Sequence, residues 1–301
     1  MTDLSVILCT HNPREDYLLR VLKGLRFQSL PLHRWELLVV DSASEVPLAP
    51  RIDLSWHEKG YVLREEEAGQ LRARVRGIRD AKGELLVFVD DDNVLDPDYL
   101  AQALTISREH PRLGVWGGSA IADYEKAPPP WFKPYEHVIS VREITRDEWS
   151  NVPEMNEPWV IGAGMVVRRE LADPYAELVL SDTRRMMLGR KGSSIMGADD
   201  LDFILSICDQ GFGRGVFQSL RLTHLIPSSR CNEDYLWNLA KCNAASMELI
   251  RIFRSEGGKL SHSSLLVRTL EWARELRLPP HAKRYARAVR KGTDLARELL
   301  S

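Results

Sequence analysis

The sequence has few of the features that mark membrane, secreted or nucleic-acid-binding proteins. Its longest uninterrupted apolar run, residues 159–167, is far shorter than the roughly 20 residues that a membrane-spanning helix needs. The N-terminus has neither the basic start nor the small-residue cleavage site of a secretory signal. A net charge of -2 argues against bulk binding to nucleic acid. We therefore expect a globular chain that neither spans a membrane nor binds nucleic acid.

Cysteine is also scarce. Cys9, Cys208, Cys231 and Cys242 form no CxxC pair and no disulfide-like pattern. Isolated cysteines of this kind are typical of reduced thiols in the cytoplasm. We therefore expect a cytoplasmic protein, with the inner face of the membrane as an alternative location.

A glycine-rich phosphate loop is missing as well. No GxGxxG motif follows any strand-like segment, which argues against a dehydrogenase that binds a nicotinamide cofactor. The polar segment 9–16 after the first strand, CTHNPRED, contains no glycine at all.

What the first half of the chain does contain is an alternation of strand-like and helix-like segments. This order implies crossover connections and an α/β fold with a mostly parallel sheet. Ligands bind such sheets beyond the carboxyl ends of the strands, where Thr10, Asp41 and the Asp90–Asp92 run are expected. The expected strands are 4–10, 35–41, 60–64 and 84–90, and the expected helices are 14–28, 69–83 with Gly83 as its C-cap, and 96–110 with Pro97 in its first turn.

The second half is less regular. Residues 125–137 are rich in proline and predict a loop or extended segment, and residues 159–171 predict a strand that runs into a helix. Residues 181–200 predict a long polar loop that can act as a mobile lid. The further helices expected are one from Asp199 or Asp200 to Gly211, and those over 234–256, 262–276 and 280–300.

Three adjacent aspartates, Asp90, Asp91 and Asp92, end the strand at 84–90. Hard divalent cations such as Mg²⁺ and Mn²⁺ prefer carboxylate oxygens and share their coordination shell with substrate phosphates. An acidic turn with Asp92 or Asp96 capping the next helix is the alternative interpretation.

Four blocks occur in an order that identifies a family. SVILCTHN (5–12), ELLVVDSAS (36–44), LRARVRGI (71–78) with AKGELLVFVDDDN (81–93), and MGADDLDF (196–203) together resemble the family-2 glycosyltransferases with the GT-A fold, over roughly residues 3–230. The resemblance implies a GT-A type Rossmann-like, mostly parallel sheet flanked by helices, with a C-terminal helical extension. The implied organisation is a glycosyltransferase domain over 1–230, with a nucleotide-sugar-binding half (1–122) and an acceptor-binding and catalytic half (123–230), and a helical region over 231–301.

The resemblance also implies a donor site. The chain departs from the family pattern at His11 for an aromatic residue, Ser42 for an acidic one and Val75 for asparagine. The lysine and arginine of the lid segment are expected to close over the donor diphosphate, or else to form an exposed basic loop. The nucleotide-sugar-binding residues implied are Thr10, His11, Asn12, Asp41, Ser42, Arg74, Asp90, Asp91, Arg190 and Lys191.

For catalysis, the resemblance implies that Asp92, with His224, binds Mn²⁺ or Mg²⁺, and that Arg230 contacts a phosphate. A purely structural role is the alternative for His224. The catalytic base implied is Asp200, with Asp199 as the second choice. The alternative is that both aspartates serve only as caps of their helix, since carboxylates suit a helix N-terminus.

The function implied is transfer of a sugar, with inversion, from a nucleoside-diphosphate sugar to a hydroxyl of a saccharide or lipid-linked acceptor in surface polysaccharide biosynthesis. There are two alternatives. One is a sugar nucleotidyltransferase, which would need a glycine-rich phosphate loop, and the other is a catalytically inert nucleotide- or carbohydrate-binding protein. Sugar stacking on an acceptor is one interpretation of four aromatic residues, and core packing is the other. These residues are Trp131, Phe132, Trp149 and Trp159.

The C-terminal segment 251–301 carries 12 Lys or Arg and 5 Asp or Glu residues. A basic amphipathic helix here could make a peripheral membrane contact. The solvated face of a packed helical hairpin, or a homodimer contact, is the alternative that we favour.

Overall fold

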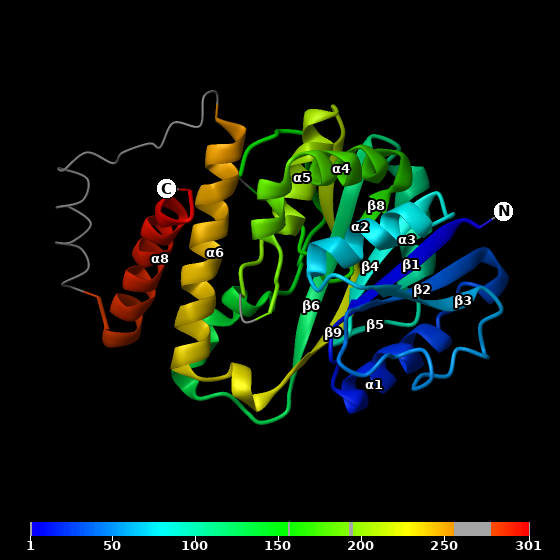
Figure 1. Cartoon of the computed structure of the whole chain (residues 1–301), viewed down its shortest axis with the longest axis horizontal. Coiled ribbons are helices and arrows are strands. Elements are labelled where there is room, and N and C mark those ends of the chain that lie inside the picture. Colours follow the sequence, from blue (N-terminus) through cyan, green and yellow to red (C-terminus); the bar gives the residue numbers. More distant parts are fainter. Residues whose placement is uncertain (1, 156, 193–194, 256–277, 301) are drawn as a thin grey trace.

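The computed structural model describes residues 2–155, 157–192, 195–255 and 278–300 (Figure 1). Its strands are β1 (Leu4–Thr10), β2 (Trp35–Ser42), β3 (Gly60–Glu65), β4 (Leu85–Asp90), β5 (Asn93–Leu95), β6 (Leu113–Tyr124), β7 (Glu148–Ser150), β8 (Val166–Arg168) and β9 (Gly213–Ile226). Its α-helices are α1 (Glu15–Arg26), α2 (Gln70–Asp80), α3 (Tyr99–Glu109), α4 (Arg169–Ser181), α5 (Asp199–Asp209), α6 (Glu233–Arg254) and α8 (Pro280–Glu298). Short 3-10 helices cover Leu32–Arg34, Pro130–Ile139 (η2), Thr183–Leu188 (η3) and Ser228–Arg230.

These strands form one mixed sheet in the order β3-β2-β1-β4-β8-β6-β9-β5, with β7 paired to β9. The first four strands are parallel, as are β6 and β9, whereas β5, β7 and β8 are antiparallel to their neighbours. The prediction of a mostly parallel α/β sheet flanked by helices is confirmed. In the register of the sheet, Thr10 lies beside Asp41 and Cys9 beside Asp90, so these polar strand ends share one edge.

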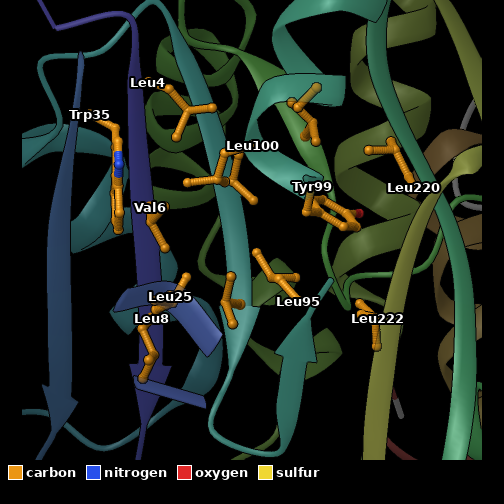
Figure 2. Close-up of a cluster of buried hydrophobic side chains, with 14 of the residues drawn as sticks. Leu4, Val6, Leu8, Leu25, Trp35, Leu95, Tyr99, Leu100, Leu220 and Leu222 are labelled. Carbon is orange, nitrogen blue, oxygen red and sulfur yellow. The ribbon is translucent and has the colours of Figure 1, made fainter. Parts of the chain in front are cut away.

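Helices cover both faces of the sheet because successive side chains of a strand point to opposite faces. Leu4, Val6 and Leu8 of β1 pack into a core with α1 and α3, part of which is shown in Figure 2. Ile7 and Cys9 of the same strand pack on the other face with α2, α4 and α5. The central strands β1, β2 and β4 are therefore mostly apolar and almost wholly buried, as expected for strands covered on both faces.

The C-terminal helices form a further layer beside this sandwich (Figure 1). Helix α6 packs against η2 and η3, and α8 packs along α6 with Ala288, Gly292 and Ala296 buried. This packing agrees with the helical-hairpin interpretation of the basic segment. The helix expected over 262–276 lies outside the described residues. No helix in the described part of the chain combines the length and the apolar character that a bilayer span requires.

Three predictions of local structure are wrong. Helix α2 ends at Asp80 with Ala81 as its C-cap, and Gly83 is needed for another reason, since a Cβ there would lie 2.5 Å from the backbone of Leu4. Helix α3 begins at Tyr99, so Pro97 precedes it and is not in its first turn. Part of the segment expected to be a loop, 125–137, instead enters the 3-10 helix η2, where Pro130 stands at the N-terminal position that proline tolerates.

The second half departs further from the sequence-based expectation. The predicted loop over 181–200 contains the 3-10 helix η3, and its residues 193–194 lie outside the described part of the chain. The strand expected within 159–171 is only β8, three residues long. The longest strands of the sheet, β6 and β9, were not predicted.

Candidate active site

A cavity of about 340 Å³ lies at the carboxyl ends of β1, β2 and β4. Its lining comes from these strand ends, from α2, from β9, from the start of α5, from η2 and from α6. Most of the residues assigned from the resemblance line it, both candidate bases included: Thr10, His11, Ser42, Arg74, Asp90, Asp91, Asp92, Arg190, Lys191, Asp199, Asp200 and His224.

The strand ends of β1 and β2 are linked by short contacts. His11 Nδ1 lies 2.7 Å from the Ser42 carbonyl oxygen, and the Gly69 N–H donates to Ser42 Oγ at 3.0 Å. The Thr10 hydroxyl donates to the Asp91 carboxylate. These contacts hold one end of the cavity, where the resemblance expects the nucleoside.

Asn12 and Asp41 lie away from the cavity lining. The Asp41 carboxylate is buried and accepts hydrogen bonds from the Ser44 and Leu48 N–H groups and from Arg64. Burial alone would raise the pKa of Asp41, but these hydrogen bonds hold the pKa below its usual value. Asn12 Oδ1 accepts from the Glu45 N–H. Both side chains therefore shape the loop after β2, and their predicted contact with the nucleotide stays a prediction.

The three consecutive aspartates occupy different surroundings. Asp90 and Asp91 are half-buried, whereas Asp92 is buried. Burial, with the neighbouring Asp92 charge, raises the pKa of Asp91 to about 7, against the hydrogen bond from Thr10. Burial also opposes ionisation of Asp92, but His224 and Arg230 outweigh it and hold the pKa of Asp92 well below its usual range.

Asp92 and His224 meet because of strand register. In the β5–β9 pair, Asn93 lies opposite His224, and the Leu225 N–H donates to the Asp92 carbonyl oxygen at 2.8 Å. Asp92 Oδ2 lies 3.6 Å from His224 Nε2 and 2.9 Å from Arg230 Nη1. Asp92 is distant in the sequence from His224, and the antiparallel pairing of β5 with β9 brings the two to one corner of the cavity, where Arg230 also lies.

The residues present fit a divalent cation that takes most of its ligands from substrate. In the described residues, no group of three or more His, Cys, Asp and Glu side chains converges on one point. Asp92 and His224 supply one carboxylate and one imidazole nitrogen, and the buried His224 Nδ1 has no hydrogen-bond partner. Such sparse protein ligation suits Mg²⁺ or Mn²⁺ bound together with a diphosphate and water.

Arg74 lies between the two acidic groups of the cavity. Its guanidinium is 2.5 Å from Asp199 Oδ2 and 3.8 Å from Asp90 Oδ1, and its side chain is only 5% exposed. Burial together with Asp200 and Asp90 raises the pKa of Asp199 to about 6, although Arg74 opposes this rise. Arg74 is therefore paired with carboxylates in this state, and its predicted contact with the diphosphate stays a prediction.

Asp200 differs from Asp199 in exposure and partners. Asp199 is buried and paired, whereas Asp200 is half-buried and lines the cavity. The Gly162 N–H donates to Asp200 Oδ2 at 2.8 Å, and the Leu201 N–H donates to Oδ1 at 2.8 Å. A Cβ at position 162 would lie 3.2 Å from Asp200 Oδ2 and 2.7 Å from Arg74 Nη2, so glycine lets the backbone reach both side chains.

Sequence reasoning missed several residues of the cavity. Gln70 donates to Asp90 Oδ1 at 3.4 Å, and Tyr235, Leu239 and Asn243 line the cavity from α6. The predicted boundary at 230 thus runs between segments that share one cavity wall. The four aromatic residues considered for the acceptor site lie elsewhere: Phe132 and Trp131 pack near α6, Trp149 is exposed beside His110, and Trp159 packs against the cluster at α5 and α6.

Comparison with curated proteins gives distant relatives. An uncharacterized protein y4gI of Sinorhizobium fredii is 23% identical over 270 residues, which are 88% of this chain and 26% of that protein. Poly(ribitol-phosphate) beta-N-acetylglucosaminyltransferase TarS of Staphylococcus aureus is 28% identical over 113 residues, 36% of this chain and 20% of TarS. Glycosyltransferase AglE of Haloferax volcanii is 28% identical over 92 residues, 30% of each chain. The chain spans less than a third of the length of these relatives.

Solved structures share the fold over nearly the whole chain. The crystal structure of S. aureus TarS 1-349 in complex with UDP-GlcNAc matches with a TM-score of 0.53 and 16% identity, over 99% of this chain and 92% of that one. Another crystal structure of S. aureus TarS 1-349 matches with a TM-score of 0.51 and 17% identity, over 98% of this chain and 83% of that one. The model of the family described as Glycosyl transferase family 2 matches residues 5–175, more than half of the sequence. The chain therefore belongs to glycosyl transferase family 2.

Proposed function

We propose that this chain transfers a sugar from a nucleoside-diphosphate sugar to a hydroxyl of a saccharide or lipid-linked saccharide, with inversion at the anomeric carbon. One observation carries the proposal. A single cavity contains a half-buried carboxylate suited to act as a base, Asp200, and a separate corner where Asp92 and His224 would hold a divalent cation beside Arg230. Family membership supports a nucleotide sugar as the donor.

The donor diphosphate would bind where cations face the cavity. Arg230, Arg190 and Lys191 line it and provide charges that complement phosphate oxygens. Mg²⁺ or Mn²⁺ held by Asp92 and His224 would neutralise charge on the diphosphate as a Lewis acid. Thr10, His11 and Ser42 would then lie at the nucleoside end.

Asp200 would take the proton of the acceptor hydroxyl as its oxygen attacks the anomeric carbon. The helix start and the Gly162 N–H hold this carboxylate in place. Asp199 is paired with Arg74. We therefore propose a single base and no second nucleophile. Reaction without a second nucleophile inverts the anomeric configuration.

The donor proposed is a UDP-sugar, because a matching TarS structure is a complex with UDP-GlcNAc and the likeness covers 99% of this chain. For the acceptor, surface polysaccharide assembly at the cytoplasmic side of the membrane follows from the resemblance alone. No feature of the described cavity lining supports a sugar nucleotidyltransferase.

Release of UDP from UDP-GlcNAc in the presence of Mg²⁺, with and without simple glycoside acceptors, tests the proposal. The wild type should release UDP, and Asp200→Asn should lower the acceptor-dependent rate by about 10²–10⁴-fold, the usual contribution of a general base. Asp173→Asn on α4, exposed and remote from the cavity, is the matched control and should match the wild type. Nucleotide binding without any turnover would replace the proposal with an inert binding protein.

A further inference from the structure

The wall of the cavity has two chemically distinct parts. Among the described lining residues, the strand ends, α2, β9 and α5 bring five aspartates and several cations. The remaining part, from the end of η2 and from α6, contributes no ionisable group except the Tyr235 phenol. This part, here called the neutral wall, consists of Val138, Ile139, Ser140, Tyr235, Leu239 and Asn243.

The neutral wall offers apolar surface beside a few polar atoms. Leu239, Val138 and Ile139 are buried and present hydrocarbon, and Tyr235 adds a ring with a hydroxyl. The Asn243 amide donates to the Val138 carbonyl oxygen at 3.4 Å, a long bond that leaves most of its hydrogen-bonding capacity for another partner.

Ser140 has an unusual backbone at the same wall. Its φ is 61°, in the left-handed region where a residue with a Cβ is strained. Backbone strain of this kind persists where the surroundings impose it, and it often accompanies ligand contacts. Ser140 is also the C-cap of η2 and is among the residues that line the cavity.

A pyranose ring has the matching surface, because its C–H faces pack on aromatic and aliphatic side chains while its hydroxyl or acetamido groups need donors and acceptors. A sugar carboxylate would instead need a cation. The neutral wall provides none, because the cations of the cavity lie in its other part, where we place the donor diphosphate.

We propose that the neutral wall is the subsite for an uncharged sugar ring and that Asn243 is a specificity-determining residue within it. The inference rests on the proposed function and deepens it. Helix α6 lies beyond residue 175, where the family match ends, so the match itself assigns no role to Asn243. The ring is that of either the acceptor or the donor sugar, and the experiment separates the two.

The test uses the whole chain with Mg²⁺ and three variants. Asn243→Ala removes the amide, Asn243→Asp replaces it with a charge of nearly the same shape, and Asn238→Ala changes an exposed asparagine of the same helix as the matched control. Ligand-observed NMR measures the Kd of methyl β-N-acetylglucosaminide and of methyl β-glucuronide in the presence of UDP. Calorimetry measures the Kd of UDP and of UDP-GlcNAc.

The N-acetylglucosaminide should bind to the wild type and the glucuronide should not. Loss of the amide should weaken binding of the neutral ring about fivefold, the fold-change of one neutral hydrogen bond. If the ring is the acceptor's, the glycoside Kd rises in both Asn243 variants. If it is the donor's, the Kd of UDP-GlcNAc rises and that of UDP does not. Asn238→Ala should change neither.

The inference would be overturned if Asn243→Asp had the same Kd as the wild type for the N-acetylglucosaminide and also for UDP-GlcNAc. Binding of the glucuronide as tight as that of the neutral glycoside would overturn it too, as would no glycoside binding in a protein that binds UDP and UDP-GlcNAc with equal affinity. In these cases the proposed function stands. Absence of UDP binding would instead refute the proposed function.

Discussion

At the scale of single residues, the site is a set of buried and half-buried carboxylates, of which the buried ones, Asp92 and Asp199, are paired with arginines. Arg74 pairs with Asp199 and lies near Asp90, and Arg230 pairs with Asp92. A buried ion pair is a weak source of net stability, but removing one partner leaves a buried charge without compensation. The arginines therefore determine which aspartates remain ionised and where their oxygens lie.

Replacement of Arg74 tests this role of the arginines. The pKa of Asp199 is about 6 in the folded chain and 3.8 in the reference state, so the folded state binds the extra proton between these pH values. The free energy of unfolding should therefore fall as the pH rises from about 4 to about 6. Arg74→Met removes the cation that opposes this pKa rise. It should lower the free energy of unfolding by about 3–5 kcal/mol at pH 7.5 and by less at pH 4.5, as measured by urea unfolding.

Arg72→Met is the control for this experiment. Arg72 lies on the same helix and pairs with Glu67, whose side chain is 65% exposed, so its loss should change stability by less than about 1 kcal/mol. Equal losses for Arg74→Met at both pH values would show that Asp199 does not depend on this cation.

At the scale of elements, the pairing of β6 with β9 decides where His224 lies. These strands run side by side with a register shift between Gly117 and Ser119. At Gly118 the backbone of β9 approaches so closely that a Cβ would lie 1.9 Å from the Leu220 carbonyl oxygen. Glycine is required here by the neighbouring strand, and the irregularity sets the register of the downstream segment that faces Asp92.

Gly118→Ala should therefore destabilise the fold by about 1–3 kcal/mol or more, because backbone atoms must move to admit the methyl group. Gly117→Ala is the matched control, since the nearest atom to its Cβ would be the tip of Val160 at 3.2 Å. Its loss of stability in urea unfolding should be clearly smaller. A Gly118→Ala variant as stable as Gly117→Ala would contradict this close approach of the two strands.

At the scale of the whole molecule, the C-terminal helices complete the cavity that the sheet begins. Helix α6 contributes to two hydrophobic clusters and to the cavity wall, and α8 supports it from the other side. The contact between α6 and α8 is close at Gly292, where a Cβ would lie 2.2 Å from the Lys241 carbonyl oxygen. The basic residues on the outer face of α8 leave the helix free to pack through its small residues.

Gly292→Ala separates helix propensity from packing. Alanine in place of glycine would stabilise an exposed helix by about 1 kcal/mol, whereas here the close contact predicts a loss of about 1–3 kcal/mol. Lys291→Ala, at an exposed position of the same helix, should leave stability nearly unchanged. A rise in melting temperature for Gly292→Ala in a thermal unfolding experiment would refute the close packing of α8 on α6.

The sequence by itself determined the parallel strands of the first half, because their continuous apolar runs and the helices between them have few alternative arrangements. It also predicted that Thr10, Asp90–Asp92 and the Asp199–Asp200 pair lie close together, because strand ends share an edge and the motif blocks resemble those of the family, and all of these residues line one cavity. Local propensity failed for η2, for β6 and for β9, because their formation depends on contacts with distant strands and helices.

Only the tertiary structure decided which aspartate is buried and paired with an arginine and which is half-buried. Asp199 and Asp200 are adjacent and chemically identical, and the difference comes from Arg74 on another helix and from the Gly162 backbone. The contribution of α6 to the cavity wall could not be predicted from the sequence either, because the pattern of an amphipathic helix does not show which surface the helix will cover. Long-range packing determines the positions of these groups, and no local pattern in the sequence predicts that packing.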